Sequence, residues 1–152
     1  TDLTSGATVA FERGPVAPAV RASAAIPGIF APVAIDGRLY VDGGVSNPVP
    51  ADVARRLGAE VVIAVSIPRE IPASPPRTQV GVALQSIGIM GAEIGRCRER
   101  EADVVITPEV GDVAFDDFTQ KRRLIEAGIA ATRAALPEIR RAIAARTKRV
   151  PQ

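Results

Sequence analysis

The sequence of 152 residues contains no histidine, no tryptophan and a single cysteine, Cys97. Without histidine, a Ser-His-Asp triad cannot be assembled from these residues, and the usual acid-base side chain of neutral pH is missing. One cysteine excludes an internal disulfide and a zinc site built on cysteines, and it fits a reducing compartment. Aromatic residues make up only 3% of the chain, so platforms for stacking nucleic-acid bases are scarce.

Long apolar runs are lacking as well, since no stretch approaches the roughly 18 apolar residues of a membrane span. The formal net charge of +2 is too small to indicate nucleic-acid binding. Basic residues gather at 96–100 and 121–149, where a solvated helix face is the favoured interpretation and contact with anionic lipid is the alternative. With 47% hydrophobic and 24% charged residues, the composition predicts one globular domain with a sizeable core.

The densest pattern lies between residues 22 and 50, where turn, strand and acidic signals follow one another. Two β-prone runs, 33–35 and 39–41, are joined by Asp36-Gly37, a pair typical of a two-residue hairpin turn. The segment Asp42-Gly43-Gly44 then ends the second strand. A carboxylate followed by two residues without Cβ permits close approach of a backbone or a substrate. Asp42 is therefore the leading candidate site residue, and a purely structural turn aspartate is the alternative.

The rest of the sequence predicts an α/β fold. Helices are expected at residues 16–24, 50–58, 79–100, 118–136 and 138–148, and strands at 8–11, 60–67 and 102–108. The last two strands are nearly unbroken apolar runs, so burial on both faces is expected, in a largely parallel sheet. The expected packing stripes are Val80, Ala83, Leu84, Ile87, Met90, Ile94 and Cys97 on one helix, and Leu124, Ile125, Ile129 and Leu136 on another.

Two connections carry signals of their own. Residues 68–77 are rich in proline, which predicts an exposed connection. Asp112, Asp116 and Asp117 lie close together, but they lack the alternating ligands and the closing glutamate of an EF-hand loop. Helix capping is the preferred interpretation of these aspartates, and no metal-ligand cluster is visible in the sequence.

Three segments, 1–6, 21–30 and 42–50, together resemble the C-terminal half of the bacterial patatin-like phospholipases. In that family the aspartate of the D-G-G turn is the partner of a serine nucleophile, so the resemblance assigns the general base to Asp42. It further implies supporting positions at Gly43, Gly44, Asn47, Ser23 and Pro27. The implied fold is a partial patatin-like α/β domain, in which helices flank a largely parallel sheet and a β-hairpin precedes the D-G-G turn.

The nucleophile itself is missing, because none of the six serines lies in the G-x-S-x-G pattern of a nucleophile elbow. The resemblance places the serine and a glycine-rich oxyanion segment upstream, so residues 1–152 are expected to be the C-terminal portion of a single catalytic domain. The implied activity is hydrolysis of lipid acyl esters, of the phospholipase A or lysophospholipase kind, by a Ser-Asp dyad without metal or cofactor. This chain alone is expected to be inactive. The alternative is a non-catalytic α/β module or a degenerate hydrolase.

The expected partners follow from that assignment. They are a lipid or lysolipid ester as substrate and the missing N-terminal half of the domain, with no nucleic acid. The expected location is cytoplasmic, with peripheral contact to a membrane as an extension of the lipid-hydrolase interpretation.

Overall fold

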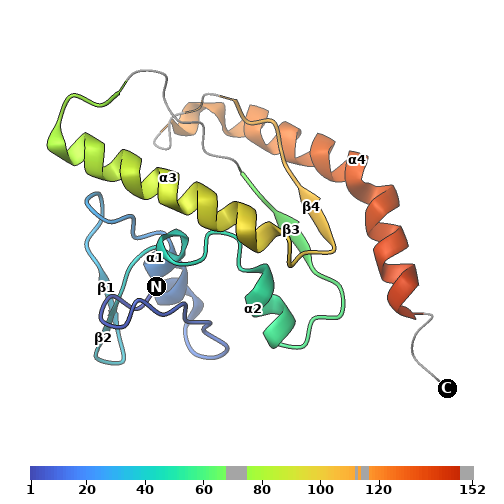
Figure 1. Ribbon diagram of the computed structural model, residues 1–152, viewed down its shortest axis with the longest axis horizontal. Coiled ribbons are helices and arrows are strands. Elements are labelled where there is room, and N and C mark those ends of the chain that lie inside the picture. The colour runs from blue at the N-terminus through green and yellow to red at the C-terminus, as the bar shows by residue number, and fades with distance from the viewer. Residues whose placement is uncertain (68–74, 112, 114–116, 148–152) are drawn as a thin grey trace. The chain divides into compact units, whose positions relative to one another are not determined.

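The computed structural model describes residues 1–67, 75–111, 113 and 117–147 (Figure 1). The chain divides into two compact units, Thr1–Pro48 with Ile71–Arg96, and Val49–Glu70 with Cys97–Gln152. Within the described residues each unit has one two-stranded sheet, antiparallel in the first and parallel in the second. Helices accompany both sheets, so the predicted α/β class is confirmed.

The predicted hairpin is present in the first unit. Strand β1 (Val33–Ile35) pairs antiparallel with β2 (Arg38–Tyr40), and Val33 lies opposite Tyr40. Asp36 and Gly37 have φ angles of 49° and 75°, both positive, as a two-residue turn of this kind requires. The Asp-Gly pair thus sets the register of the strands that lead to Asp42.

The strand predicted at residues 8–11 is wrong, because the free edge of β2 is occupied by the start of the chain instead. Leu3 N donates to Leu39 O at 2.8 Å, and Val41 N donates to Thr1 O at 2.9 Å. With β1 on its other side, β2 has no edge left for residues 8–11. Phe11 contributes a side-chain contact, edge-to-face with Tyr40 at a centroid distance of 5.1 Å.

Helix α1 (Val16–Ser23) packs against β1, as the sequence predicts a helix there. The core beneath it consists of small and β-branched side chains with one aromatic ring: Ala22, Ala25, Val33 and Tyr40. The helix ends before Pro27-Gly28, where Gly28 has a φ angle of 82° and the Ile26 carbonyl accepts from Ile29 and Phe30. This turn returns the chain to the hairpin.

Helix α3 (Gln79–Glu99) matches the predicted span, but its packing face agrees only in part with the predicted stripe, of which Leu84, Ile87 and Ile94 are partly buried. Val80 and Met90 are exposed, whereas Gly95 is the buried residue of the helix. Gly91, four residues earlier, lies so close to the D-G-G turn that an added Cβ would be 3.6 Å from Gly44 O. Glycines spaced three or four apart share a helix face, and the lack of side chains there lets the backbone approach closely.

The second unit contains α2 (Ala51–Arg56) and the parallel pair β3 (Ile63–Val65) and β4 (Val104–Ile106), with Ile63 beside Val104. The expectation of burial on both faces is wrong. Neighbours in a parallel register share a face, yet Val104 and Ile106 are buried while Ile63 and Val65 are exposed. Each face of this sheet is therefore only partly covered. In the described residues the sheet has two strands, so β3 has a strand on one side only.

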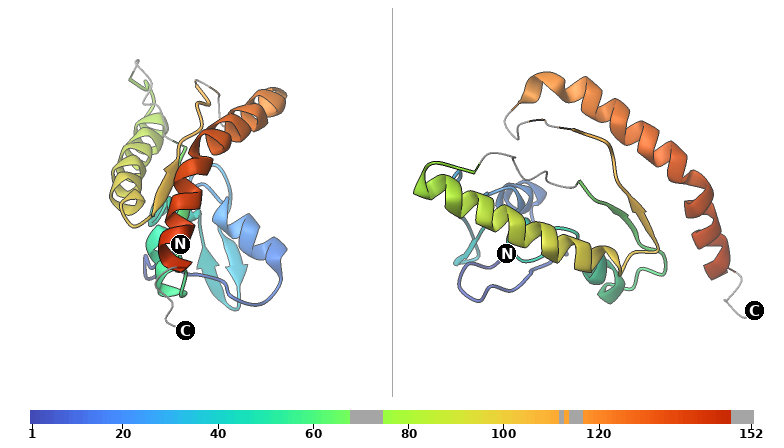
Figure 2. Two further views of the ribbon diagram at one scale, coloured as in Figure 1. Left: turned by 90° about the vertical axis from the view of Figure 1, so that its right-hand side faces the viewer. Right: turned by 45° about the horizontal axis from the view of Figure 1, so that its top comes forward.

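Helix α4 (Lys121–Thr147) is continuous, so the prediction of two helices separated at Pro137 is wrong. Asp117 caps the 3₁₀ turn η2 (Phe118–Gln120) just before it, accepting from Thr119 N at 3.0 Å, which agrees with a capping role. Proline removes one backbone N–H and bends a helix without having to end it, and Figure 2 shows α4 bending along its length. Asp112, Asp116 and residues 68–74 lie outside the described residues.

The face that α4 turns toward β4 also differs from the prediction. The helix packs against β4, and its least exposed positions are three or four residues apart: Leu124, Ala127, Ala131, Ala135, Ile139 and Ala142. Leu124 is therefore placed as predicted, whereas Ile125, Ile129 and Leu136 are exposed. The alanines let the helix approach the strand closely, and the larger residues lie on the next stripe around the helix.

Candidate functional site

The Asp42 turn follows β2 directly and is held by backbone hydrogen bonds on both sides. Asp42 N donates to Ala25 O at 3.0 Å, which ties the turn to the residues after α1. Asp42 then caps the 3₁₀ turn η1 (Gly43–Val45), and its Oδ1 accepts from Gly44 N at 2.7 Å. The capping bond fixes the orientation of the carboxylate.

One carboxylate oxygen of Asp42 remains open. Gly44 N–H is the hydrogen-bond donor to Oδ1, and Oδ2 makes no hydrogen bond to the described residues. The side chain is only partly buried, so a proton donor can reach the carboxylate. An oriented carboxylate with one open oxygen is suited to accept a proton.

Both glycines of the turn allow close approaches. A Cβ on Gly44 would lie 3.0 Å from Asp42 Oδ1, and a Cβ on Gly43 would lie 3.3 Å from Ser23 Oγ. Either methyl group would press on the residue beside it. The glycine pair therefore serves close packing around Asp42, as the sequence pattern indicates.

A group of hydroxyls lies behind the Asp42 turn, and sequence reasoning missed it. Thr1 Oγ1 donates to Asp42 O at 3.0 Å and lies 2.7 Å from Ser46 Oγ. Ser46 Oγ is also 2.8 Å from Thr8 Oγ1. Nothing in the local sequence could have revealed this cluster, because Thr1 and Ser46 are 45 residues apart and meet only through the hairpin.

Asp2 is a second carboxylate that the sequence analysis did not single out. Its buried side chain accepts from Thr4 N and Ser5 N at 2.9 Å each, and it pairs with Arg38 Nε at 2.6 Å. The hydrogen bond from Ser5 N is the main cause that lowers the pKa of Asp2 below its usual range. The charged carboxylate holds Thr1–Leu3 against β2 and so supports the hydroxyls behind Asp42.

The remaining predicted residues surround this turn. Ser23 is the last residue of α1 and its hydroxyl lies beneath Gly43. Pro27 is half-buried in the turn that follows the helix. Asn47 is buried, and its backbone N donates to Gly43 O at 2.8 Å. The structure thus brings Ser23, Pro27 and Asn47 into the same neighbourhood as Asp42.

A cavity of about 440 Å³ adjoins the turn within the first unit. Its walls include Val9, Phe11, Val16 and Val20, and Ser23 and Gly43 also line it. Val16, Val20 and Ser23 of α1 lie three and four residues apart, so they line the cavity from one face of the helix. Apolar side chains thus form most of the lining, and Glu12 and Arg13 add charged groups to it.

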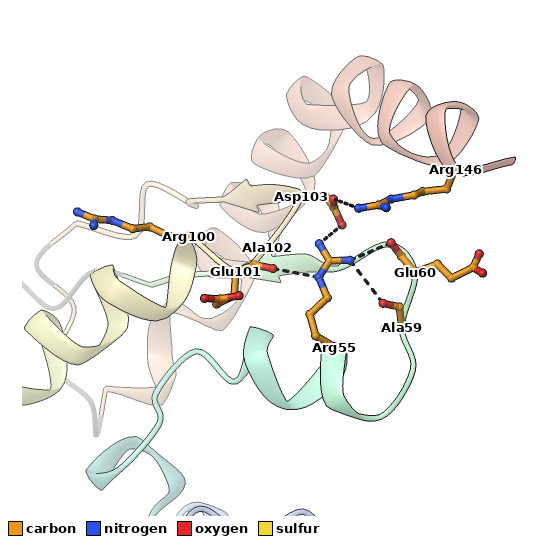
Figure 3. Close-up of a pocket in the computed structure, with 8 residues that line it drawn as sticks. All are labelled: Arg55, Ala59, Glu60, Arg100, Glu101, Ala102, Asp103 and Arg146. Atoms are coloured by element: carbon orange, nitrogen blue, oxygen red, sulfur yellow. Dashed lines mark hydrogen bonds and ion pairs between the residues drawn. The ribbon is translucent and has the colours of Figure 1, made fainter. Parts of the chain in front are cut away.

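A second hollow, of about 610 Å³, lies in the other unit and is organised by Arg55 (Figure 3). Arg55 donates to the carbonyls of Ala59, Glu60 and Glu101 and, through Nη2, to Asp103 Oδ2 at 2.5 Å. Arg146 approaches the other Asp103 oxygen at 3.5 Å. The arginine donors are thus occupied by the protein itself, and the cluster joins two loops and α4.

Asp103 carries the negative charge of that cluster. Its Oδ2 also accepts from Val62 N at 2.8 Å, and this bond, followed by the contact with Arg55, lowers the pKa of Asp103 below its usual range. Three basic and three acidic residues line the hollow, so their formal charges cancel. The hollow is therefore a structural ion-pair cluster rather than a site for an anion.

Comparison with known proteins finds a family model that matches the segment containing the D-G-G turn. Residues 1–55 match the model of the patatin-like phospholipases. The chain is 49% identical over 67 residues to an uncharacterized NTE family protein of Mycobacterium tuberculosis, a match covering 44% of this chain and 19% of that protein. It is 44% identical over 69 residues to patatin-like phospholipase domain-containing protein 7 of Rattus norvegicus, covering 44% of this chain and 5% of that protein.

The resemblance noted in the sequence is therefore confirmed for the N-terminal part of the chain. The matched segment contains Asp42 and all of its predicted supporting residues, Gly43, Gly44, Asn47, Ser23 and Pro27. The matches span at most about a fifth of the length of these relatives.

Proposed function

We propose that this chain is part of a patatin-like lipid acyl hydrolase in which Asp42 is the general base of a Ser-Asp dyad. The observation that carries the proposal is the state of the Asp42 carboxylate, which one backbone N–H orients and which leaves Oδ2 open. The family match over residues 1–55 supports the chemistry, and the neighbouring apolar cavity supports a lipid substrate.

In this proposal Asp42 Oδ2 takes the proton from a serine hydroxyl while the serine oxygen attacks the ester carbonyl. The tetrahedral intermediate then expels the alcohol of the lipid, which receives the proton, and an acyl-serine remains. A water molecule, deprotonated by the same carboxylate, attacks the acyl-serine; the fatty acid is released, and the proton passes from Asp42 to the serine oxygen. Backbone N–H groups stabilise the oxyanion in both steps.

The serine is supplied by a part of the protein outside this chain. None of the six serines has the flanking glycines of a nucleophile elbow. Ser23 lies at the end of α1 close to Gly43, and Ser46 ends η1 with its hydroxyl bonded to Thr1 and Thr8. We therefore assign to this chain the base and its support, and to a preceding segment the nucleophile and the oxyanion donors. The 152-residue chain by itself is expected to be inactive.

The acyl chain of the substrate would lie in the cavity beside the turn. Val9, Phe11, Val16 and Val20 offer apolar walls, and the end lined by Gly43 is where the ester group would meet the base. Burying a methylene group contributes about 0.8 kcal/mol, so a long acyl chain gains substantial affinity from such walls. A lipid substrate also requires the protein to reach a membrane, which is consistent with peripheral attachment.

The test uses the full-length protein with a lysophospholipid, measuring released fatty acid, and a serine-directed fluorophosphonate followed by peptide mapping. The expected result is hydrolysis together with labelling of one serine outside residues 1–152. The 152-residue chain alone, treated in the same way, should show neither. Labelling of Ser23 or another serine of this chain would contradict the division of roles, and a full-length protein that hydrolyses no lipid ester would be a non-catalytic module.

A further inference from the structure

Helix α4 carries a second apolar stripe that does not face β4. Ile125, Ile129, Leu136 and Ile143 are all exposed, Ile125 by 60% and Ile143 by 48%. Their spacings of four and seven residues place them along one line on the helix, about a quarter of a turn from the alanine-rich side. From Ile125 to Ile143 this outer stripe extends over about 27 Å at a rise of 1.5 Å per residue.

A row of arginines runs beside the outer stripe. Arg122 lies three residues before Ile125, Arg133 lies four after Ile129, and Arg140 lies four after Leu136, so each is next to an apolar member on the helix surface. Arg122 forms a surface ion pair with Glu126, whereas Arg133 and Arg140 form none with the described residues. Their charges are therefore available to an external partner.

Helix α4 as a whole carries a net positive charge, which attracts anionic groups. It contains seven lysine and arginine residues against two glutamates. A helix with basic residues beside a stripe of exposed aliphatic residues is suited to lie in the interface of a bilayer. There the apolar side chains enter the acyl boundary, and the arginines extend to the phosphate groups.

A protein partner fits these features less well. Protein interfaces concentrate their binding energy in tryptophan, tyrosine and arginine side chains within pockets, and this surface has arginines but no aromatic side chain. In the part of the chain that the structure describes, no helix is long and apolar enough to cross a membrane.

We propose that the outer stripe of α4, with Arg122, Arg133 and Arg140, docks the protein on bilayers that contain anionic lipid. The alanine-rich side of α4 stays packed on β4 in the docked state. This inference does not depend on hydrolysis, because the surface contains none of the residues of the Asp42 turn and binding can be measured without turnover.

The test is co-sedimentation of the full-length protein with vesicles of phosphatidylcholine alone or with about 30% phosphatidylserine. Binding to the anionic vesicles is expected to be at least about tenfold tighter and to weaken steeply toward about 0.5 M salt. Each basic residue near an anionic surface contributes about fivefold, so Arg140→Gln should weaken binding by that factor. The matched control, Arg141→Gln, removes the same charge from the adjacent position on another face and should change binding by less than about twofold.

A second variant tests the apolar stripe. Ile143→Ser is exposed in the wild type and should keep the thermal midpoint while weakening vesicle binding by about tenfold, since an apolar side chain no longer enters the bilayer. Equal binding to neutral and anionic vesicles, or equal effects of Arg140→Gln and Arg141→Gln, would overturn the proposal. It would also be overturned if Ile143→Ser left vesicle binding unchanged but reduced the particle mass in light scattering, because a second copy of the protein would then cover the stripe.

Discussion

The hairpin unit and the parallel-strand unit hold their key residues in different ways. Around Asp42, backbone hydrogen bonds and glycines fix the chain locally, and Asp36, Gly37 and Gly28 have positive φ angles suited to their turns. Around β3 and β4, side-chain ion pairs of Arg55 and Asp103 join distant segments, and several apolar residues stay exposed. The first unit fixes the position of the Asp42 carboxylate, whereas the second unit links distant segments by ion pairs and leaves apolar residues exposed.

A proton-accepting side chain and a contact surface require different local structure. A carboxylate that must accept a proton needs its orientation fixed within a fraction of an ångström, and backbone donors provide that at little entropic cost. A surface that meets a bilayer or another part of the protein needs exposed apolar area instead. Three substitutions, each with a control, test whether the two units differ in this way.

Among these three comparisons, the largest effect is expected from Gly44→Ala in the full-length protein. The new Cβ would lie 3.0 Å from Asp42 Oδ1, so the carboxylate must move away from its present position. We expect turnover of a lysophospholipid to fall by about 10- to 100-fold with an unchanged thermal midpoint. Gly128→Ala is the control, because a Cβ there meets nothing within 4 Å and turnover should be unaffected. Full turnover by Gly44→Ala would show that the position of this carboxylate is unimportant.

The next effect compares the two faces of β4. Val104 is 2% exposed and Val105 is 37% exposed, so the same Val→Ala change removes buried contacts at one position and few at the other. Val104→Ala should lower the free energy of unfolding by about 2 kcal/mol, and Val105→Ala by at least about 1 kcal/mol less. Urea denaturation of both variants measures the difference. Equal losses would mean that Val105 is covered by a part of the protein outside the described residues.

A smaller, pH-dependent effect is expected for Asp103→Asn. The folded-state pKa of Asp103 lies below its unfolded value, so its stabilisation is complete above the unfolded pKa, near pH 4, and is lost as pH falls through the folded value. At neutral pH the variant should unfold with about 1–2 kcal/mol less free energy than the wild type. This difference in unfolding free energy between variant and wild type should disappear in acid, and urea denaturation at a series of pH values measures it. Asp36→Asn, at an exposed turn position, is the control and should unfold with the same free energy as the wild type. A loss of stability in Asp103→Asn that persists in acid would refute the ion-pair account.

Sequence reasoning succeeded where local chemistry decides the structure. The Asp36-Gly37 turn, the end of α1 before Pro27 and the glycine pair after Asp42 were all predictable, because each depends on backbone angles or on missing Cβ atoms. The Thr1, Thr8 and Ser46 hydroxyls were not predictable, since the hairpin brings them together from distant positions.

Burial was the weaker prediction, for a physical reason. An apolar run or stripe shows that one face of a strand or helix can be buried. Whether it is buried depends on which other segments pack against that face. Ile63 and Val65 in β3 and Ile129 in α4 have the residue types of a core and yet are exposed. In α3, the glycines rather than the larger residues marked the packing side, because close backbone approach there outweighs side-chain size.

The most direct test of the central claim is the turnover of the full-length Asp42→Asn variant beside Asp36→Asn. Asparagine keeps the size of the side chain and can still accept from Gly44 N–H, but it cannot take a proton. The account predicts a loss of about 10⁴-fold for Asp42→Asn and no measurable loss for Asp36→Asn, because Asn-Gly suits the same hairpin turn. A folded Asp42→Asn protein that retains more than about a tenth of wild-type turnover would contradict the claim, since general-base catalysis is worth roughly 10²–10⁴-fold.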